Sequence, residues 1–283
     1  MRTKMEKNSK TLTINRYEQQ LHCHGISFRY SKGASHMEGN EIHPYHEILY
    51  YMGGNATFVS EKFKEVLTPG TLLLIPKASY HQFIIHNQGA YTRLVLNFSD
   101  AGEAESLSAS VLRGIRILRH PDSRLVKLLE QMCQVVNSND FTSQSGIRNT
   151  FLYGAFLILF AELSREDELI SSPQLREKDG IMPECLHYID RHFTSDLSVE
   201  EVADQLNVSA STLAHTFKKE LGISFYRYII EKRLVHAHRL ISEGHKPTQI
   251  YLECGYHDYP TFYKAYLKMF GCSPADKQAN PIN

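Results

Sequence analysis

The feature that most constrains the fold is a pattern that occurs twice in the C-terminal third of the chain. In its first copy, residues 196–222, Ser198 and Ser209 are each suited to cap the start of a helix. Asn207 stands between these two helices, and Asn tolerates the left-handed backbone that a tight turn requires. The copy therefore predicts a helix–turn–helix unit. Its apolar positions follow helical spacing: Val199, Val202, Ala203, Leu206, Leu213 and Phe217.

The second copy spans residues 246–274 and has Gly255 at its turn. An amphipathic stretch, residues 225–244, separates the copies and predicts one long helix that holds them at a fixed distance. Two such units on one rigid helix can reach successive major grooves of DNA, which lie roughly 34 Å apart. The apolar positions of the second copy are Ile250, Phe262, Tyr266 and Phe270.

The first third of the chain predicts β-strands. Six short runs are rich in Ile, Val, Leu, Tyr and Phe, and Gly, Asn and Pro separate them, which favours a barrel or a sandwich. After a polar break at residues 100–110, two helical patterns cover residues 122–136 and 147–166. Both carry apolar surface that suits a dimer interface, although packing on their own barrel is the alternative. The six runs are residues 26–31, 46–52, 55–60, 70–76, 81–86 and 91–98.

Composition narrows the class of protein. The formal net charge is zero, with 31 Lys and Arg against 31 Asp and Glu, so no overall basic field predicts nucleic-acid binding, and only local phosphate contacts stay open. The five cysteines are scattered and form no CxxC pair, which favours reduced thiols. The longest apolar helical run, residues 151–163, is short for a membrane span, and the N-terminal segment lacks the apolar core of a signal peptide. We expect a soluble, cytoplasmic protein without a membrane partner.

These features together resemble the AraC/XylS family of bacterial transcription regulators. The resemblance rests on LSVEEVADQLNVSASTLAHTFKKELGISFYRYIIEKRL, on CGYHDYPTFYKAYLKMFGCSP and on the strand-rich first third, which is similar to that family's sensor domain. It implies a two-domain α+β fold, with an N-terminal all-β cupin-like (double-stranded β-helix) barrel, dimerisation helices, and a C-terminal all-α domain with two helix–turn–helix units. The implied boundaries are 1–110 for the barrel, 111–166 for the helical dimerisation segment, 167–180 for the linker and 181–283 for the DNA-binding domain.

The resemblance also implies which side chains contact double-stranded DNA. The base-reading positions of the family fall on the second helix of each unit, and Lys218 and Lys219 suit contacts to phosphate. The alternative for each position is a solvated surface residue. The complete DNA-binding set is Ser209, Ser211, Ala214, His215, Lys218, Lys219, Tyr259, Pro260, Thr261, Tyr263 and Lys264.

The chain departs from the family pattern at several of these positions. The family usually has Arg where this chain has His215 and Lys264, and only Arg forks onto the edge of a guanine. Tyr251 stands where a small residue normally lets the helices of the second unit pack, so it must turn outward or widen the pair. Residues 181–283 contain 11 Lys and Arg against 12 Asp and Glu. We therefore expect modest DNA affinity as a monomer.

The stretch HPYHEILYY, residues 43–51, places two histidines and a glutamate at the start of an apolar strand of the predicted barrel. Side chains alternate along a strand, so His43, Tyr45 and Glu47 would share one face, whereas His46 would point the other way. Imidazoles and a carboxylate beside aromatic rings suit a small polar effector such as a sugar. For each tyrosine, ordinary packing is an equally good interpretation. The predicted effector-binding set is Tyr30, His43, Tyr45, His46, Glu47, Tyr80 and His81.

Three of these residues keep a second interpretation open. His43, Glu47 and His81 form a two-histidine, one-carboxylate set that suits iron or manganese, so the chain could be a metal-dependent cupin enzyme with a helical partner-binding tail. However, His43 and His46 are three residues apart, whereas the paired histidines of metal cupins are two apart, and DNA binding explains the C-terminal pattern better. We therefore expect no cofactor, no bound metal and no catalytic residue.

The sequence as a whole predicts a one-component transcription regulator. It would act as a homodimer on promoter or operator DNA, respond to a small effector, and contact RNA polymerase as an activator. The expectation of activation rests on the resemblance alone.

Overall fold

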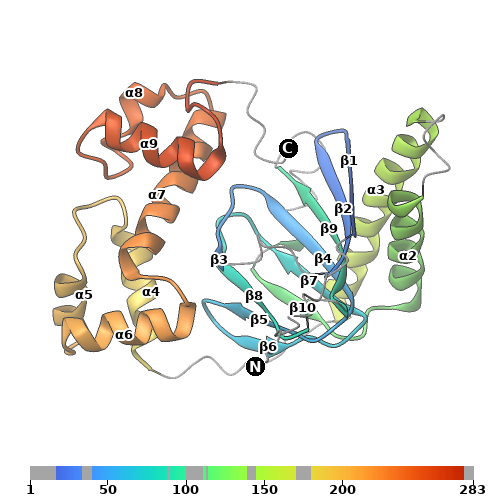
Figure 1. Cartoon of the computed structure of the whole chain (residues 1–283), viewed down its shortest axis with the longest axis horizontal. Coiled ribbons are helices and arrows are strands. Elements are labelled where there is room, and N and C mark those ends of the chain that lie inside the picture. The colour runs from blue at the N-terminus through green and yellow to red at the C-terminus, as the bar shows by residue number, and fades with distance from the viewer. Residues whose placement is uncertain are drawn as a thin grey trace, which may run out of the picture.

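The computed structural model describes residues 17–33, 40–87, 90–99, 111–112, 114–138, 145–169 and 180–276. Figure 1 shows a strand-rich N-terminal half with two helices against its outer side, and a helical C-terminal half beside it. This arrangement confirms the expected two-domain α+β class.

The N-terminal half is built from two antiparallel sheets whose facing side chains share one core. Within the described residues, the larger sheet has the order β1-β2-β9-β4-β7-β10 and the smaller sheet the order β3-β8-β5-β6. The larger sheet comprises β1 (Tyr17–Cys23), β2 (Ile26–Lys32), β9 (Thr92–Phe98), β4 (His46–Gly53), β7 (Thr71–Ile75) and β10 (Arg116–Leu118). The smaller sheet comprises β3 (Asn40–Glu41), β8 (His81–Ile85), β5 (Ala56–Ser60) and β6 (Lys64–Val66).

Side chains alternate across the larger sheet and give it two different faces. Along β4, Ile48 and Tyr50 pack in the core that the helices share, whereas Leu49 packs between the two sheets. Glu47 lies directly opposite Asn97 of β9, so both side chains face the space between the sheets. The alternation therefore places the polar side chain of Glu47 in the interior, at the start of β4.

Two helices cover the outer face of the larger sheet (Figure 1). They are α2 (Ser123–Asn137) and α3 (Ser145–Leu169). Within α3, the segment Gly146–Arg165 is long and apolar enough to cross a membrane by length and composition alone. Its buried residues instead share a core with the sheet and α2: Leu152, Ala155, Phe156, Leu159, Phe160 and Leu163. Among the described side chains of the helix, three large apolar ones are exposed, namely Ile147, Phe151 and Ile158.

The C-terminal half contains two helix–turn–helix units joined by one helix, as predicted. The first unit consists of α5 (Val199–Gln205) and α6 (Ala210–Leu221), and α4 (Ile181–His192) precedes it. Helix α7 (Phe225–Ser242) leads to the second unit, α8 (Pro247–Ile250) and α9 (Tyr259–Phe270). The expected apolar anchors are buried in both units: Leu213, Phe217, Phe262 and Tyr266.

Local signals define the first unit. The Ser198 hydroxyl accepts from the N–H of Glu201, and the Ser209 hydroxyl accepts from the N–H of Thr212, each at 3.1 Å, so both predicted caps are confirmed. Asn207 has φ +54°, which is the left-handed turn expected of it. The sequence also suits a capping box, in which the Glu201 side chain would accept from the N–H of Ser198, but the Glu201 carboxylate accepts from the Tyr188 hydroxyl at 3.1 Å instead.

The second unit reaches the same geometry differently. Its first helix, α8, is four residues long. Gly255 follows with φ +82°, and a Cβ there would lie 2.7 Å from the carbonyl oxygen of Thr194, so only glycine fits. Tyr251 is half-buried and meets the ring of Tyr259 edge-on at 5.8 Å between centroids. The ring of Tyr251 therefore lies against the start of α9.

Some boundaries differ from expectation. Strand β10 pairs with β7, so the larger sheet extends into the segment from residue 111 that we expected to be helical throughout. The sequence also missed β1, β3 and β6, because β1 carries few apolar residues and the other two are only two and three residues long. Residues 1–16 and 100–110, and 170–179 of the expected linker, lie outside the described residues.

The Asn207 turn can be tested by substitution. We expect Asn207→Val to lower the free energy of unfolding by about 1–2 kcal/mol, because a branched side chain is strained at positive φ. Asn207→Gly should be close to neutral, because glycine adopts that backbone freely. Chemical denaturation of the full chain measures both variants, and equal stability of the two would contradict the turn geometry.

Candidate functional site

The second helices of both units present most of the predicted DNA-binding residues to solvent. On α6, Lys218 and Lys219 lie in the last turn, and His215 stands one turn earlier, all exposed. On α9, Lys264 is exposed and Tyr263 is half-buried. The other exposed members of the set are Ser209, Ser211, Ala214, Pro260 and Thr261, and Tyr259 is half-buried.

Two members of that set also hold their helices in place. The Ser209 hydroxyl caps α6, and its oxygen lies 2.8 Å from the hydroxyl oxygen of Thr212. Thr261 donates from its N–H and its hydroxyl to the carboxylate of Asp258, at 2.7 and 2.9 Å, at the start of α9. These contacts fix the N-terminal turns of the two helices, which are the turns that enter a groove first in this motif.

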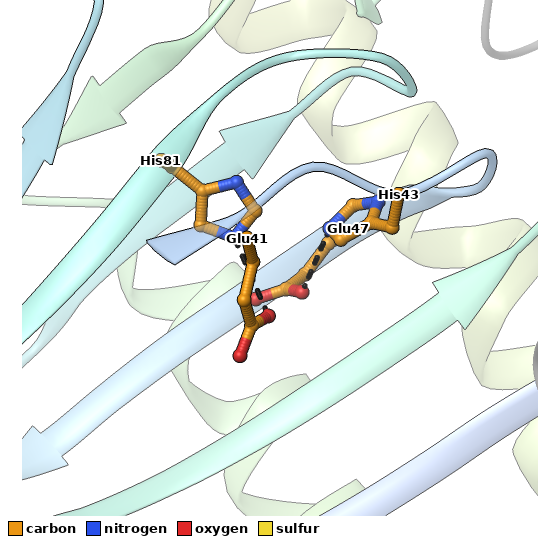
Figure 2. A group of neighbouring side chains, drawn as sticks. All are labelled: Glu41, His43, Glu47 and His81. Atoms are coloured by element: carbon orange, nitrogen blue, oxygen red, sulfur yellow. Dashed lines mark ion pairs between the residues drawn. The ribbon is translucent and has the colours of Figure 1, made fainter. Parts of the chain in front are cut away.

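A second candidate site lies between the sheets of the barrel. Figure 2 shows the side chains of Glu41, His43, Glu47 and His81 converging on one point. Glu41 is on β3, His81 is opposite it on β8, Glu47 is on β4, and His43 is in the connection between β3 and β4. The Nε2 atom of His43 is 3.3 Å from Glu47 Oε2, and Nε2 of His81 is 3.8 Å from Glu41 Oε2.

Burial and neighbouring charges shift the pKa values of these side chains, and for Glu47 the two effects have opposite signs. Burial raises the pKa of Glu47, but the pairing with His43 and the charges of Arg29 and of His81 in its protonated form outweigh it and lower the pKa to about 2. Burial and the Glu47 charge raise the pKa of Glu41 to about 7, although 37% of that side chain is accessible. Burial lowers the pKa of His81 to about 4, so its imidazole is neutral at pH 7.

Other polar residues line the same interior, and the sequence prediction missed them. Asn97 lies opposite Glu47 and Ser27 in the sheet register, and Arg29 follows on the same face of β2. The Nε of Arg29 and Oδ1 of Asn97 are buried without a hydrogen-bond partner. Glu41 was missed as well. The available signal was the alternation in ISFRYS, which sets Ser27, Arg29 and Ser31 on one face.

The predicted effector residues do not all meet in this interior. His43, Glu47 and His81 do, and the ring of Tyr45 stacks on that of His43 at 4.1 Å. The structure separates the other three from them. Tyr30 packs on the helix side of the larger sheet, and His46 packs there against Phe98 with 5.4 Å between ring centroids. Side chains alternate along a strand, so these two residues point to the face of the sheet opposite to that of Glu47. Tyr80 points into the C-terminal half.

Tyr80 belongs to a contact between the two halves of the chain. Its buried hydroxyl donates to the carbonyl of Leu221 at the end of α6. Its ring meets that of Tyr228 on α7 edge-on, with 5.6 Å between centroids. The Tyr228 hydroxyl donates to Glu61 of the barrel, and Lys232 Nζ lies 4.0 Å from that carboxylate and 3.3 Å from the Tyr228 oxygen. Burial raises the pKa of Glu61 and of Tyr228.

Comparisons with known proteins match both halves. The family model for the AraC-like ligand binding domain matches residues 25–156, and that for a helix-turn-helix domain matches residues 202–280. An uncharacterized HTH-type transcriptional regulator, YdiP of Escherichia coli K12, is 22% identical over 255 residues, which are 88% of this chain and 84% of that protein. The HTH-type transcriptional activator RhaS of Escherichia coli is 22% identical over 244 residues, 83% of this chain and 85% of its own.

Two solved structures are also similar to parts or most of this chain. ToxT from Vibrio cholerae is 12% identical over 92% of this chain and 96% of its own, with a TM-score of 0.39, too low to compare the placement of the two halves. The C-terminal domain of AraT from Geobacillus stearothermophilus is 35% identical over 34% of this chain and 81% of its own, with a TM-score of 0.33.

The named relatives are transcription regulators, so they give no support to the alternative of a metal-dependent enzyme. An N-terminal ligand-binding domain and a C-terminal DNA-binding domain, in this order, make the chain an effector-responsive regulator. The chain belongs to the AraC/XylS family of transcription regulators.

Proposed function

We propose that the chain activates transcription in the cytoplasm by placing α6 and α9 in successive major grooves of promoter DNA. The observation that carries the proposal is the presence of two exposed second helices on one connecting helix, α7. The exposed residues of the DNA-binding set would contact the duplex, with Lys218 and Lys219 at phosphates and His215, Tyr263 and Lys264 near base edges. Activation through RNA polymerase follows the name of RhaS, a transcriptional activator.

We further propose a carbohydrate as the effector. It would enter between the sheets beside Tyr45 and His43, whose stacked rings offer a flat face. The unpaired atoms of Arg29 and Asn97 support this proposal, because buried polar groups without partners suit the hydroxyls of a sugar.

The contact between the halves supplies a route for the effector to act. Tyr80 directly precedes His81 in the chain, and its hydroxyl donates to the carbonyl of Leu221. A ligand that displaces His81 would therefore also displace Tyr80 and alter its hydrogen bond to the end of α6. The effector would bind the two arrangements of this contact with different affinity, and the position of α6 would follow.

Dimerisation through α3 completes the proposal. Ile147, Phe151 and Ile158 are spaced by four and seven residues, so they lie along one stripe of the helix. Their exposed fractions are 62%, 38% and 54%, which is unusual for three large apolar side chains on one face. A second copy of the stripe would cover them, and a dimer would raise the modest affinity expected of one chain.

DNA binding can be tested with duplexes selected from a random pool by the full-length protein. We expect Lys218→Ala to weaken binding to every selected duplex and to reduce the slope of log affinity against log salt by about 1. His215→Ala should alter the preferred bases within one half-site and leave the salt slope nearly unchanged. Lys127→Ala on α2, also an exposed lysine, is the matched control. Failure to enrich any duplex would contradict the proposal.

The α3 stripe predicts a dimer that one charge disrupts. We expect Ile158→Glu to raise the dimer dissociation constant at least about tenfold, because an interfacial carboxylate loses its water without gaining a partner. Val66→Glu is the control, since Val66 is 65% exposed on β6, far from the stripe in the sequence. Sedimentation velocity distinguishes the two variants, and a wild-type chain that stays monomeric at micromolar concentration would refute the dimer.

The contact between the halves predicts a local loss of protection. We expect Tyr80→Phe to speed amide hydrogen exchange at the end of α6 about fivefold, because a net hydrogen bond contributes about 1 kcal/mol. The affinity for DNA should change in the same variant. Tyr226→Phe is the control, because Tyr226 lies on α7 near Tyr228 but is 50% exposed. Equal exchange in both variants would show that the Tyr80 contact does not hold the halves together.

A further inference from the structure

Four side chains between the sheets offer one metal-binding atom each. Every pair of these atoms in Glu41, His43, Glu47 and His81 lies within 4.8 Å. Two atoms bound to one transition-metal ion, each at about 2.1 Å, are at most about 4.2 Å apart. Small movements of side chains therefore suffice to bring all four atoms onto one ion, and the partly exposed Glu41 is free to make the largest.

The backbone fixes which nitrogen of each histidine points inward. Nδ1 of His43 lies 2.7 Å from the carbonyl oxygen of Tyr45, and Nδ1 of His81 lies 3.1 Å from that of Ser79. A carbonyl oxygen only accepts, so each Nδ1 carries the hydrogen and donates it. A neutral ring then has its lone pair on Nε2, facing the carboxylates. This is the arrangement that holds histidine ligands of metal ions in their binding tautomer.

Both inward nitrogens lack a hydrogen bond. Nε2 of His43 and Nε2 of His81 are buried without a partner, and these residues are 5% and 0% exposed. The Nε2 of His43 lies 3.3 Å from Oε2 of the buried Glu47, and the Nε2 of His81 lies 3.8 Å from Oε2 of the partly exposed Glu41; both oxygens carry lone pairs of their own. Buried acceptors that face one another are costly, and a cation between them removes that cost.

We propose that the barrel binds one divalent first-row transition-metal ion, such as Mn²⁺, Fe²⁺ or Zn²⁺, through Glu41, His43, Glu47 and His81. Imidazole nitrogens favour these ions over Mg²⁺ and Ca²⁺, which prefer oxygen ligands alone. Glu41 is the ligand that the sequence prediction lacked, and it converts a three-residue set into a four-residue one. The site is independent of DNA binding, so either proposal can fail without the other.

Metal binding by the full-length chain tests the site directly. After treatment with chelator and dialysis, the protein is equilibrated with Zn²⁺, Mn²⁺ or Mg²⁺, and the bound metal and the melting temperature are measured. We expect about one equivalent of Zn²⁺ or Mn²⁺ per chain and a rise in melting temperature, with no such effect of Mg²⁺. The visible absorption of added Co²⁺ gives a second readout that does not depend on stability.

Variants identify the ligands. We expect Glu41→Gln to weaken Zn²⁺ binding about tenfold or more and His43→Gln about 100-fold or more, with loss of the Co²⁺ band. His22→Gln is the control, because His22 is exposed on β1 and belongs to LHCHG, residues 21–25, whose two histidines flank Cys23 and are another cluster of soft ligands in the N-terminal half. Glu41→Gln changes a partly exposed carboxylate, and circular dichroism shows that the variant is folded. The absence of wild-type binding, an equal response to Mg²⁺, or binding lost in His22→Gln but retained in Glu41→Gln and His43→Gln would overturn the proposal.

Discussion

The burial of helix α7 is the constraint on which the C-terminal half depends. Its first turns place Phe225, Tyr228 and Ile229 in the core of the first helix–turn–helix unit. Its later turns place Leu234, Ala237 and Leu240 in the core of the second. A single rigid helix thus belongs to two cores, and the distance between α6 and α9 is fixed by its length. The same helix carries Tyr228 and Lys232 to the barrel, so both helix–turn–helix units and the barrel contact it.

The barrel follows a different rule, in which one face of the larger sheet packs on the helices and the other face mixes apolar and polar side chains. The helix side of β2, β9 and β4 is mostly apolar, with His46 packed there against Phe98, and α2 and α3 cover it. Between the sheets, Leu49, Phe58 and Phe83 pack in an apolar core, and the ring of His81 lies 6.0 Å from that of Phe58 and 5.8 Å from that of Phe83. The apolar side chains stabilise the fold, and the polar groups beside them, Glu47 and His81 among them, can recognise a ligand. Both tasks therefore share one interior.

The sequence alone predicted the elements whose signals are local. Asn207, Ser198 and Ser209 located the first turn and its helices, and alternation correctly divided His46 from Glu47. Residues that are assembled across the fold were harder. Glu41 sits on a two-residue strand without apolar pattern, and its link to His81 exists only in the sheet register. Tyr80 looked like a pocket residue, and no local signal shows that α6 ends against it.

Tyr80 and His81 are neighbours in the chain, yet one contacts the C-terminal half and the other the interior of the barrel. Because they share a peptide bond, a substitution that repacks either side chain shifts the backbone of the other. Substitutions that change which ligand the barrel prefers will therefore also affect how the helical half packs on the barrel, and the two properties evolve together at these residues. A change in what the barrel recognises would require a compensating change on α6 or α7, and exchanging the N-terminal half with that of a relative would need the same adjustment.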